Sequence, residues 1–363
     1  MRFLFCAGEA SGDAYAAALI RGLKVVQPRA EIQAVGGRRC AQAGVRPLVD
    51  SSRWAAIGIL ESLRIAPRVL RDAKRIRAAL RQGPPGVFVP IDFGYLNVKL
   101  AAFAKSLGWK VLYFAPPGSW RRDKQGADLP GITDLIVTQF SWSAEILRTG
   151  GADARWYGHP LVEMIEVNHS HNREWLAVLP GSRTHEATHN VPVIAETLEA
   201  MGRDLPVRFA VAPSLPVDWL KGLWERHSDR AAEFITDRTA EVLQGAQAGI
   251  ICSGTATLEA AICGCPCVVM YRGSKWMEFE YRLRKPKFQY ISLPNILLDR
   301  PLLPELIQWD ATPERVGIET RRILDETPDR ALQLDGFREL VELLGPSGGI
   351  SRTVEDLVRL ARG

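Results

Sequence analysis

The sequence has no long hydrophobic run and no paired pattern of cysteines, and both absences limit the kind of protein it encodes. None of its apolar runs reaches the ~20 residues that a helix needs to span a membrane. The apolar start, Met1–Cys6, predicts a strand rather than a signal peptide, because Gly8, Glu9 and Asp13 interrupt it too soon. The 6 cysteines fit no secreted disulfide framework. We therefore expect a cytoplasmic protein.

Two common cofactor signatures are also missing. The loop Ala7–Asp13 lacks the G-x-G-x-x-G spacing, which disfavours a dinucleotide cofactor. Cys263, Cys265 and Cys267 alternate, whereas structural zinc sites space their ligands as C-x₂₋₄-C, and the run continues into an apolar strand. Buried cysteines that behave as small hydrophobic residues explain the run better than a metal does. We expect neither a metal nor a cofactor.

Length and charge suggest two domains with different surroundings. A chain of 363 residues, 47% hydrophobic and 24% charged, is typical of about two globular domains. Residues 1–165 carry 23 Lys and Arg against 13 Asp and Glu, whereas residues 166–363 carry 23 against 28. The positive first half predicts an anionic partner. Nucleic acid is disfavoured as that partner, because no interleaved aromatics or known motif accompany the basic residues.

Short apolar strands alternate with helical stretches, and this alternation predicts an α/β fold. Strands are predicted at 2–7, 31–35, 86–91, 110–114, 135–138, 175–179, 207–211, 233–235, around 250, and at 267–271. The polar segment 163–174 is predicted to be a linker. The pattern indicates two tandem Rossmann-like domains with doubly wound parallel sheets, at 1–165 and 172–345, that face a cleft. A C-terminal helix at about 346–363 can pack back on the first domain.

The most informative segment is 249–261, where an apolar strand ends in a Ser-Gly-Thr loop and a helix begins. Backbone N–H groups of such a loop converge on one point, which suits a phosphate. Ser253, Thr255 and Thr257 add hydroxyls, and Gly254 permits close approach of a ligand. Glu259 is predicted to reach a sugar hydroxyl beside the phosphate, so a nucleoside diphosphate with a ribose is the expected ligand.

A second phosphate contact is predicted at Gly181, Ser182 and Arg183, which follow the strand at 175–179. The guanidinium of Arg183 can bind a phosphate through two hydrogen bonds. Taken alone, this segment is equally well explained as a surface turn. Because it lies in the same predicted domain as the Ser253 loop, we expect both to hold one pyrophosphate.

In the first half, Asp92 ends the strand at 86–91. A lone carboxylate at the carboxyl end of a strand faces the predicted cleft and can act as a general base toward an alcohol, or it can simply cap a helix. The loop of Gly8, Glu9, Ser11 and Gly12 follows the first strand. It is a weak signal by itself, and Ser11 and Asp13 are expected to cap the next helix.

Residues 185–189 match H-E-x-x-H, which leaves a zinc hydrolase open as an alternative. His185 and His189 would share one face of a helix, with Glu186 as the base. The motif begins two residues after the predicted phosphate turn, and no obvious third zinc ligand follows it. These features favour a ligand-facing helix over a zinc site.

Seven basic residues and one acid, Asp72, occupy positions 64–81. A helix begun by Pro67 is predicted there, with Val69, Leu70, Ala73, Ile76 and Leu80 on one apolar face. Its basic side is either merely solvated or binds the headgroups of anionic lipids.

In their order and spacing, these motifs resemble the lipid-A-disaccharide synthases. That family consists of inverting, metal-independent glycosyltransferases with two Rossmann-like domains, the GT-B architecture. The resemblance runs almost from end to end. It rests on Ala7–Asp13, Gly36-Gly37 with Gly44, Ile57–Glu61, Ile91-Asp92 with Asn97, Gly158–Leu161, Leu179–Arg183 with Glu186, Ser253–Glu259 and Ser292–Asn295.

The resemblance implies a reaction and a role for each site residue. UDP-2,3-diacylglucosamine would be joined to 2,3-diacylglucosamine 1-phosphate (lipid X), giving lipid A disaccharide 1-phosphate and UDP. Asp92 would take the proton from the 6-hydroxyl of the acceptor. Arg183 and the loop Ser253–Thr257 would hold the pyrophosphate, Glu259 would bind the ribose, and Asn295 would lie near the nucleotide.

The resemblance also implies peripheral contact with the anionic inner face of the cytoplasmic membrane, and it leaves a homodimer open. The membrane-facing residues would be Ile57, Ile59, Leu60, Leu63, Arg64, Arg68, Arg71 and Arg75.

The sequence departs from the family pattern in its first half, where the acceptor is expected. The family commonly reads Ile-Asp-Ala-Pro-Asp-Phe-Asn where this chain has Ile91-Asp-Phe-Gly-Tyr-Leu-Asn97, and segments 117–123 and Ser141 also differ. A divergent transferase with another acceptor, a UDP-sugar epimerase or hydrolase, and an inactive nucleotide- or lipid-binding member therefore remain alternatives.

Overall fold

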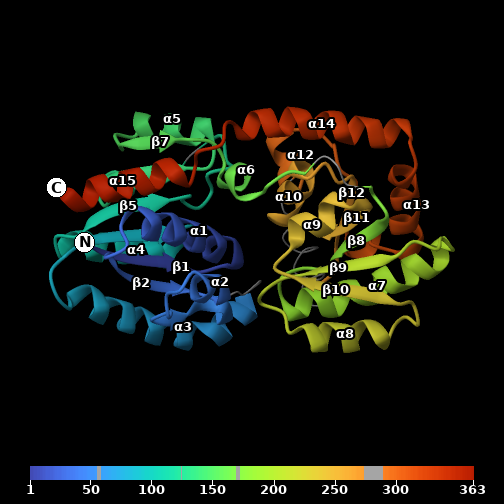
Figure 1. Cartoon of the computed structure of the whole chain (residues 1–363), viewed down its shortest axis with the longest axis horizontal. Helices are drawn as coiled ribbons and strands as arrows, with labels where there is room; N and C mark the ends of the chain where they lie inside the picture. The colour runs from blue at the N-terminus through green and yellow to red at the C-terminus, as the bar shows by residue number, and fades with distance from the viewer. Residues whose placement is uncertain (55–58, 124, 169–171, 274–288) are drawn as a thin grey trace. The chain divides into compact units, whose positions relative to one another are not determined.

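The computed structural model describes residues 1–54, 59–123, 125–168, 172–273 and 289–363. They form two compact units (Figure 1). Unit 1 consists of Met1–Met164 together with Leu344–Gly363, and unit 2 consists of Ile165–Leu343. Among the described residues, no helix is both long and apolar enough to cross a membrane.

Unit 1 is built on a parallel seven-stranded sheet in the order β3-β2-β1-β4-β5-β6-β7. Its central strands are almost entirely buried and are mostly apolar, because helices cover both faces of a parallel sheet. The strands are β1 Arg2–Ala7, β2 Glu31–Gly36, β3 Val49–Asp50, β4 Val87–Ile91, β5 Lys110–Phe114, β6 Leu135–Thr138 and β7 Ala154–Trp156.

The helices of unit 1 come from both ends of the chain. They are α1 Ala10–Val26, α2 Arg38–Gln42, α3 Ile59–Arg81, α4 Gly94–Ser106, α5 Ser141–Thr149, α6 Pro160–Met164 and the C-terminal α15 Ser351–Arg362, with a 3₁₀ turn at Ser51–Arg53. Helix α15 packs against α1, β4 and β5.

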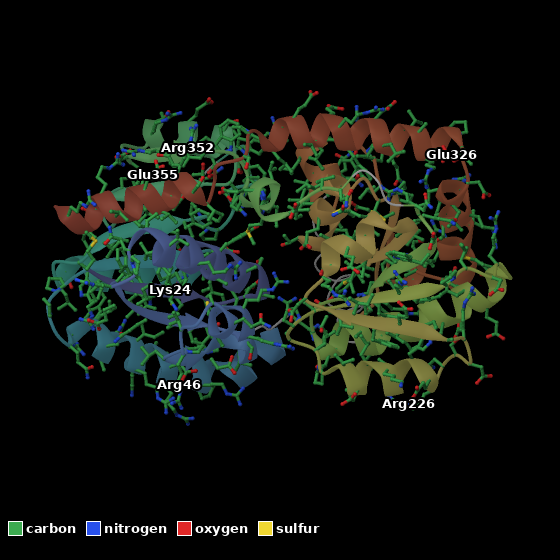
Figure 2. The ribbon with its side chains drawn as sticks, in the orientation of Figure 1. Lys24, Arg46, Arg226, Glu326, Arg352 and Glu355 are labelled. Atoms are coloured by element: carbon green, nitrogen blue, oxygen red, sulfur yellow. The ribbon has the colours of Figure 1, made fainter. Side chains whose placement is uncertain are left out.

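Polar contacts also hold α15 on unit 1. Asp356 accepts hydrogen bonds from Arg155 Nη1 at 2.8 Å and from the Tyr157 hydroxyl at 2.8 Å. Arg352, labelled in Figure 2, lies over the ring of Tyr157, with its guanidinium carbon 5.6 Å from the ring centroid. The carboxylate of Glu163 accepts from the backbone N–H groups of Ile350 and Ser351, at the start of the helix. The last helix of the chain is therefore an integral part of the unit that the chain begins.

Unit 2 is built on a parallel six-stranded sheet in the order β10-β9-β8-β11-β12-β13. Its core includes Val178, Phe209, Ile250, Val268 and Met270. The strands are β8 Trp175–Leu179, β9 Val207–Val211, β10 Ala232–Thr236, β11 Ala246–Cys252, β12 Cys267–Tyr271 and β13 Glu305–Ile307. The helices are α7 Thr184–Met201, α8 Val217–Glu225, α9 Thr239–Gln244, α10 Ala256–Ile262, α12 Leu293–Leu298, α13 Pro313–Leu324 and α14 Pro328–Leu344, with a 3₁₀ turn at Gln308–Asp310.

The predicted fold class, two parallel-sheet α/β domains, is confirmed. In each sheet the strand order reverses once, between β1 and β4 in unit 1 and between β8 and β11 in unit 2. The loops that leave the carboxyl ends of two such strands diverge to opposite faces of the sheet, and ligands of open α/β sheets bind in the crevice between them. The topology thus marks one candidate binding edge in each unit.

The helix predicted to begin at Pro67 is longer than expected. Helix α3 begins at Ile59 and contains Pro67 in its interior, where proline costs one backbone hydrogen bond but does not end the helix. Val69, Ala73, Ile76 and Leu80 pack toward the core of unit 1 as predicted. Leu70 was wrongly placed on that face: it is 64% exposed, because it lies about 100° around the helix from Val69.

Candidate active site

The switch point of unit 1 brings two distant segments of the sequence side by side. β1 and β4 pair in parallel, with Ala7 opposite Ile91. Gly8 and Glu9 follow β1, and Asp92 follows β4. The loops that leave the carboxyl ends of these two strands are therefore neighbours. The sequence predicted both loops as site candidates, and the structure places them at the same edge of one sheet.

The backbone at Asp92 is left-handed and tightly held. Asp92, Phe93 and Gly94 have consecutive φ values of 46°, 53° and 30°. The Asp92 N–H donates to the Phe114 carbonyl at 3.1 Å. Its carbonyl accepts from the Tyr113 hydroxyl at 2.9 Å and from Asn97 Nδ2 at 3.1 Å. A non-glycine residue in this conformation carries strain, which such contacts must offset.

The carboxyl group of Asp92 has a raised pKa. Burial is the main cause, the negative charge of Glu9 adds to it, and the N–H of Phe93 partly opposes both, so that the pKa rises from 3.8 to about 6. Such a group is mostly ionised at neutral pH and yet is a stronger base than an ordinary aspartate. This combination suits a general base acting on an alcohol.

Gly8 has a packing role that the sequence did not reveal. A Cβ at this position would lie 2.0–2.5 Å from three ring atoms of Phe93. That ring stacks on Trp54, with the centroids 5.4 Å apart, and the Trp54 indole donates to Asp72 at 3.0 Å. Close contact between the two loops therefore requires glycine after β1.

The rest of the Gly8 loop differs from its predicted capping role. Glu9 occupies the N-cap of α1, and no side chain caps that helix. Asp13 is buried and accepts instead from the N–H groups of Gly37, Arg39 and Cys40, at the start of α2. The prediction that Asp13 caps its own helix is wrong, because its side chain reaches across to a neighbouring loop. Ser11 is half-buried in the first turn of α1, and Gly12, behind it, is buried.

The switch point of unit 2 brings together the two predicted phosphate loops. β8 and β11 pair in parallel, with Leu179 opposite Ile251. Gly181–Arg183 follow β8, and Ser253–Thr255 follow β11. Gly254 is exposed with φ 149°, and a Cβ there would contact nothing within 4 Å, so the loop leaves space at this edge.

Arg183 is held at the start of α7 by Glu186. The Arg183 guanidinium donates to Glu186 Oε1 at 2.9 Å. Glu186 Oε2 accepts from the N–H groups of Ser182 at 2.9 Å and Arg183 at 3.2 Å. Gly181, with φ 117°, leaves room for this carboxylate, because a Cβ there would lie 2.5 Å from Oε2. The turn is thus fixed with one edge of the guanidinium bound to the protein.

The same contacts argue against the zinc hydrolase. Both carboxylate oxygens of Glu186, the proposed base, are already used: Oε2 caps the start of α7, and Oε1 accepts from the Arg183 guanidinium. Within the described part of the chain, no group of three or more His, Cys, Asp or Glu side chains could hold a metal ion. Cys263 and Cys265 are buried, and burial raises the pKa of both thiols to about 12, which makes them poor metal ligands.

The hydroxyls of the Ser253 loop are partly used within the loop itself. Ser253 Oγ donates to the Ile291 carbonyl at 2.9 Å. Thr257 is fully buried, and its hydroxyl donates to the Gly254 carbonyl at 2.8 Å. Thr257 therefore shapes the loop and does not offer its hydroxyl to a ligand, unlike the prediction. Thr255 and Glu259 are half-buried at the start of α10.

Asn295, predicted to lie near the nucleotide, uses its side chain within the protein. It is 1% exposed, and its amide is fully used: Nδ2 donates to Leu303 O and Glu305 Oε1, and Oδ1 accepts from Leu303 N–H. Glu305 Oε1 also accepts from the N–H and hydroxyl of Ser292. Asn295 and Glu305 thus anchor the segment that receives the hydroxyl of Ser253.

Sequence reasoning missed the buried residues that fix the strand ends within each unit. Asn190 is buried and bridges two strand ends, since Nδ2 donates to the Pro180 carbonyl at 2.9 Å and Oδ1 accepts from Arg272 N–H at 2.8 Å. Tyr113 and Glu305 perform similar tasks. Only their position near strand ends could have indicated them, and that signal does not say where a side chain points.

The predicted membrane-facing residues lie on or near α3. Arg68, Arg71 and Arg75 are exposed, and Arg75 lies 3.9 Å from Asp72. Ile57 lies outside the described residues, as do the side chains of Ile59, Leu60, Leu63 and Arg64.

Solved structures that resemble this chain share its two-unit architecture. The Staphylococcus aureus MnaA–UDP co-structure matches with a TM-score of 0.64 at 10% identity, covering 99% of this chain and 96% of that one. The UDP-GlcNAc 2-epimerase of Methanocaldococcus jannaschii, in complex with UDP-GlcNAc and UDP, matches with a TM-score of 0.60 at 11% identity, covering 99% and 100%. At this level of identity the likeness shows the fold.

Sequence comparison is more specific. The model of the lipid-A-disaccharide synthetase family matches residues 3–349. The lipid-A-disaccharide synthase of Myxococcus xanthus is 31% identical over 374 residues, covering 99% of this chain and 97% of its own. That of Nitrosococcus oceani is 31% identical over 370 residues, covering 97% and 94%. With a matching fold and an almost full-length match, the chain belongs to the lipid-A-disaccharide synthetase family of glycosyltransferases.

Proposed function

We propose that this protein joins UDP-2,3-diacylglucosamine to 2,3-diacylglucosamine 1-phosphate, giving lipid A disaccharide 1-phosphate and UDP. The observation that carries the proposal is the carboxyl group of Asp92, which lies at the switch point of a parallel sheet with a pKa raised to about 6. Membership of the family supplies the substrates. The divergent segments at 93–96 and 117–123 lie in unit 1, so the acceptor is the part of the proposal that most needs a direct test.

In the proposed step, Asp92 accepts the proton of the acceptor's 6-hydroxyl. The oxygen attacks the anomeric carbon of the donor as the bond from that carbon to the UDP oxygen breaks. One C–O bond forms and one breaks, the configuration inverts, and the negative charge leaves with UDP. A base with a pKa near the working pH is effective for such a transfer because it is ionised and still basic.

The donor would bind at the switch point of unit 2. Arg183 and the loop Ser253–Thr255 would hold the pyrophosphate, and Glu259 would bind the ribose. Glu186 supports this role because it fixes the orientation of the Arg183 guanidinium. Preorganised donors of this kind stabilise the charge that develops on the leaving diphosphate.

The reaction is tested with purified protein, synthetic donor and synthetic acceptor, by following UDP release and the disaccharide product by mass spectrometry. We expect product with the full protein and none with Asp92→Asn, while Asp128→Asn, a change at an exposed loop position, keeps activity. Turnover of UDP-GlcNAc without any lipid acceptor would instead identify an epimerase or hydrolase. UDP binding without turnover of any acceptor would identify an inactive binding protein.

Peripheral contact with the inner face of the cytoplasmic membrane is part of the same proposal. Leu70, Arg68 and Arg71 are exposed on α3, and an exposed leucine among basic residues suits an interface with anionic lipid. Reversal of Arg68, Arg71 and Arg75 to Glu should release the protein from vesicles that contain phosphatidylglycerol in a sedimentation assay. A matched reversal of three exposed arginines on α13 is the control, and equal binding by both variants would make α3 purely structural.

A further inference from the structure

The peptide group of Asp92 is fixed on both sides by the protein around it. Its N–H donates to the Phe114 carbonyl of β5, and its carbonyl receives the hydroxyl of Tyr113 at 2.9 Å and Nδ2 of Asn97 at 3.1 Å. Tyr113 comes from the neighbouring strand and Asn97 from the first turn of α4. Two side chains from different elements thus meet on a single backbone oxygen.

Asn97 joins the ends of two strands at this point. Its Nδ2 group also donates to the carbonyls of Cys6, at the end of β1, and Ile91, at the end of β4, both at 3.0 Å. The two hydrogens of the side-chain amide are therefore shared among three carbonyl acceptors. Asn97 is completely buried, and its Oδ1 has no hydrogen-bond partner among the described residues.

An unsatisfied buried amide oxygen costs stability, so the core gains little from an asparagine here beyond the bonds that it donates. All three of these bonds act on the backbone beside Asp92. Tyr113 is likewise completely buried, and the bond from its hydroxyl also goes to Asp92. The polar groups of both residues converge on a segment of three consecutive residues, Asp92, Phe93 and Gly94, whose φ values all lie in the left-handed region.

This conformation decides the direction of the carboxylate. Two consecutive non-glycine residues with positive φ values, Asp92 and Phe93, are in a strained conformation, and without these hydrogen bonds the segment would relax toward an ordinary turn. Relaxation would rotate the Asp92 Cα–Cβ bond and carry the carboxylate away from its present position.

We propose that Asn97 and Tyr113 are positioning residues for the transfer reaction, which clamp the Asp92 carbonyl and thereby hold the carboxylate in the orientation needed to accept a proton. The inference rests on the proposed function, in which Asp92 is the base. Neither residue touches substrate; both act through the backbone of Asp92.

The test compares three variants. Tyr113→Phe removes only the hydroxyl and keeps the buried ring. Asn97→Ala removes all three hydrogen bonds that the side-chain amide donates. Trp109→Phe is the matched control: Trp109 is a buried aromatic at the opposite end of β5, and its indole donates to the Leu80 carbonyl at 3.0 Å. The control variant loses a comparable buried hydrogen bond and more ring volume, and it should lose at least as much stability.

In the transfer assay, kcat should fall about tenfold or more in Tyr113→Phe and further in Asn97→Ala, because a base displaced by about 1 Å loses much of its effect. KM for the donor and the affinity for UDP should stay within about twofold, and Trp109→Phe should keep its kcat. An unchanged kcat in Tyr113→Phe, or an equal loss in Trp109→Phe, would overturn the proposal.

A second readout does not depend on turnover. The Asp92 carboxyl is titrated by ¹³C NMR in protein labelled at aspartate, with the resonance assigned by its absence in Asp92→Asn. We expect the pKa of Asp92 to fall in both clamp variants, as the carboxylate moves toward solvent, and to stay near 6 in Trp109→Phe. The charge near Asp92 is the same in all three variants. Glu9, whose charge also raises this pKa, is unchanged in them, and Tyr113→Phe removes only the hydroxyl of a neutral phenol.

The two readouts separate the two ideas. Absence of transfer in the unmodified protein, together with the expected pKa changes, would refute the proposed function but keep the clamp. Transfer in the unmodified protein, with the same kcat and the same Asp92 pKa in all three variants, would refute the clamp alone.

Discussion

The raised pKa of Asp92 predicts that transfer fails in mild acid, and that Glu9 sets part of this sensitivity. Burial is the larger cause of the shift from 3.8 to about 6, and the charge of Glu9 is the second. Glu9→Gln removes that charge and keeps the shape of the side chain. The pKa of Asp92 should then fall, but it should stay above its ordinary value because the burial remains.

The size of the effect follows from the ionised fraction of the base. With a pKa of about 6, roughly nine-tenths of Asp92 is ionised at pH 7 and roughly one-tenth at pH 5, so kcat/KM should fall about tenfold between them. An aspartate with an ordinary pKa would lose less than about a tenth of its ionised form over the same range. In Glu9→Gln the acidic limb should move to lower pH. At pH 5 the variant should therefore keep a larger fraction of its own maximal rate than the original protein keeps of its own.

The assay is the initial rate of UDP release from pH 4.5 to 8, at donor concentrations far below KM, so that kcat/KM reports ionisation in the free enzyme. Glu31→Gln is the control, because Glu31 is an exposed acid at the amino end of β2, away from the switch point. A rate that stays flat down to pH 5, or an equal shift in both variants, would refute the role of Asp92 as a buried base next to Glu9.

Three further outcomes follow from the geometry. Asp92→Asn should stabilise the protein at pH 7 by about 3 kcal/mol in urea unfolding and by nothing at pH 3. A carboxyl group whose pKa is raised on folding makes the folded protein less stable as the pH rises from 3.8 through 6, and one pKa unit corresponds to about 1.36 kcal/mol; equal effects at both pH values would contradict this. Arg183→Ala should weaken UDP binding by ~1.5–3 kcal/mol in calorimetry, which is the value of a hydrogen bond to a charged group. Arg203→Ala is the control and should not weaken it, because Arg203 follows the other end of α7 and forms an exposed ion pair with Asp325. Gly8→Ala should lower both the urea midpoint and the rate of transfer, because its Cβ would overlap the ring of Phe93. An unchanged midpoint would contradict this and would mean that the ring has room to move.

Most of the fold could be predicted from the sequence, because the buried strands of a parallel sheet appear as short, mostly apolar runs separated by helical and turn segments. The strands at Arg2–Ala7, Lys110–Phe114 and Cys267–Tyr271 have the predicted bounds. β3 and β7 escaped prediction because strands of two and three residues leave no detectable pattern.

The site could be predicted only at the level of loops. Ser253 and Thr257 are both hydroxyl residues of one loop, yet Thr257 points inward to the Gly254 carbonyl. Asn295 was expected beside a ligand and is instead saturated by Leu303 and Glu305. The direction of a side chain depends on partners far along the chain, and a local pattern does not contain them.

The position of α15 has a consequence for biosynthesis. Unit 2 is encoded by one uninterrupted stretch, but unit 1 lacks a helix until its last residues are made. A ribosome releases that helix only after all of unit 2 has emerged, so the nascent first half waits with the surface of α1, β4 and β5 uncovered. The unit that is synthesised first is thus completed only after unit 2, and a stop codon between unit 2 and Ser351 would damage the unit that carries Asp92.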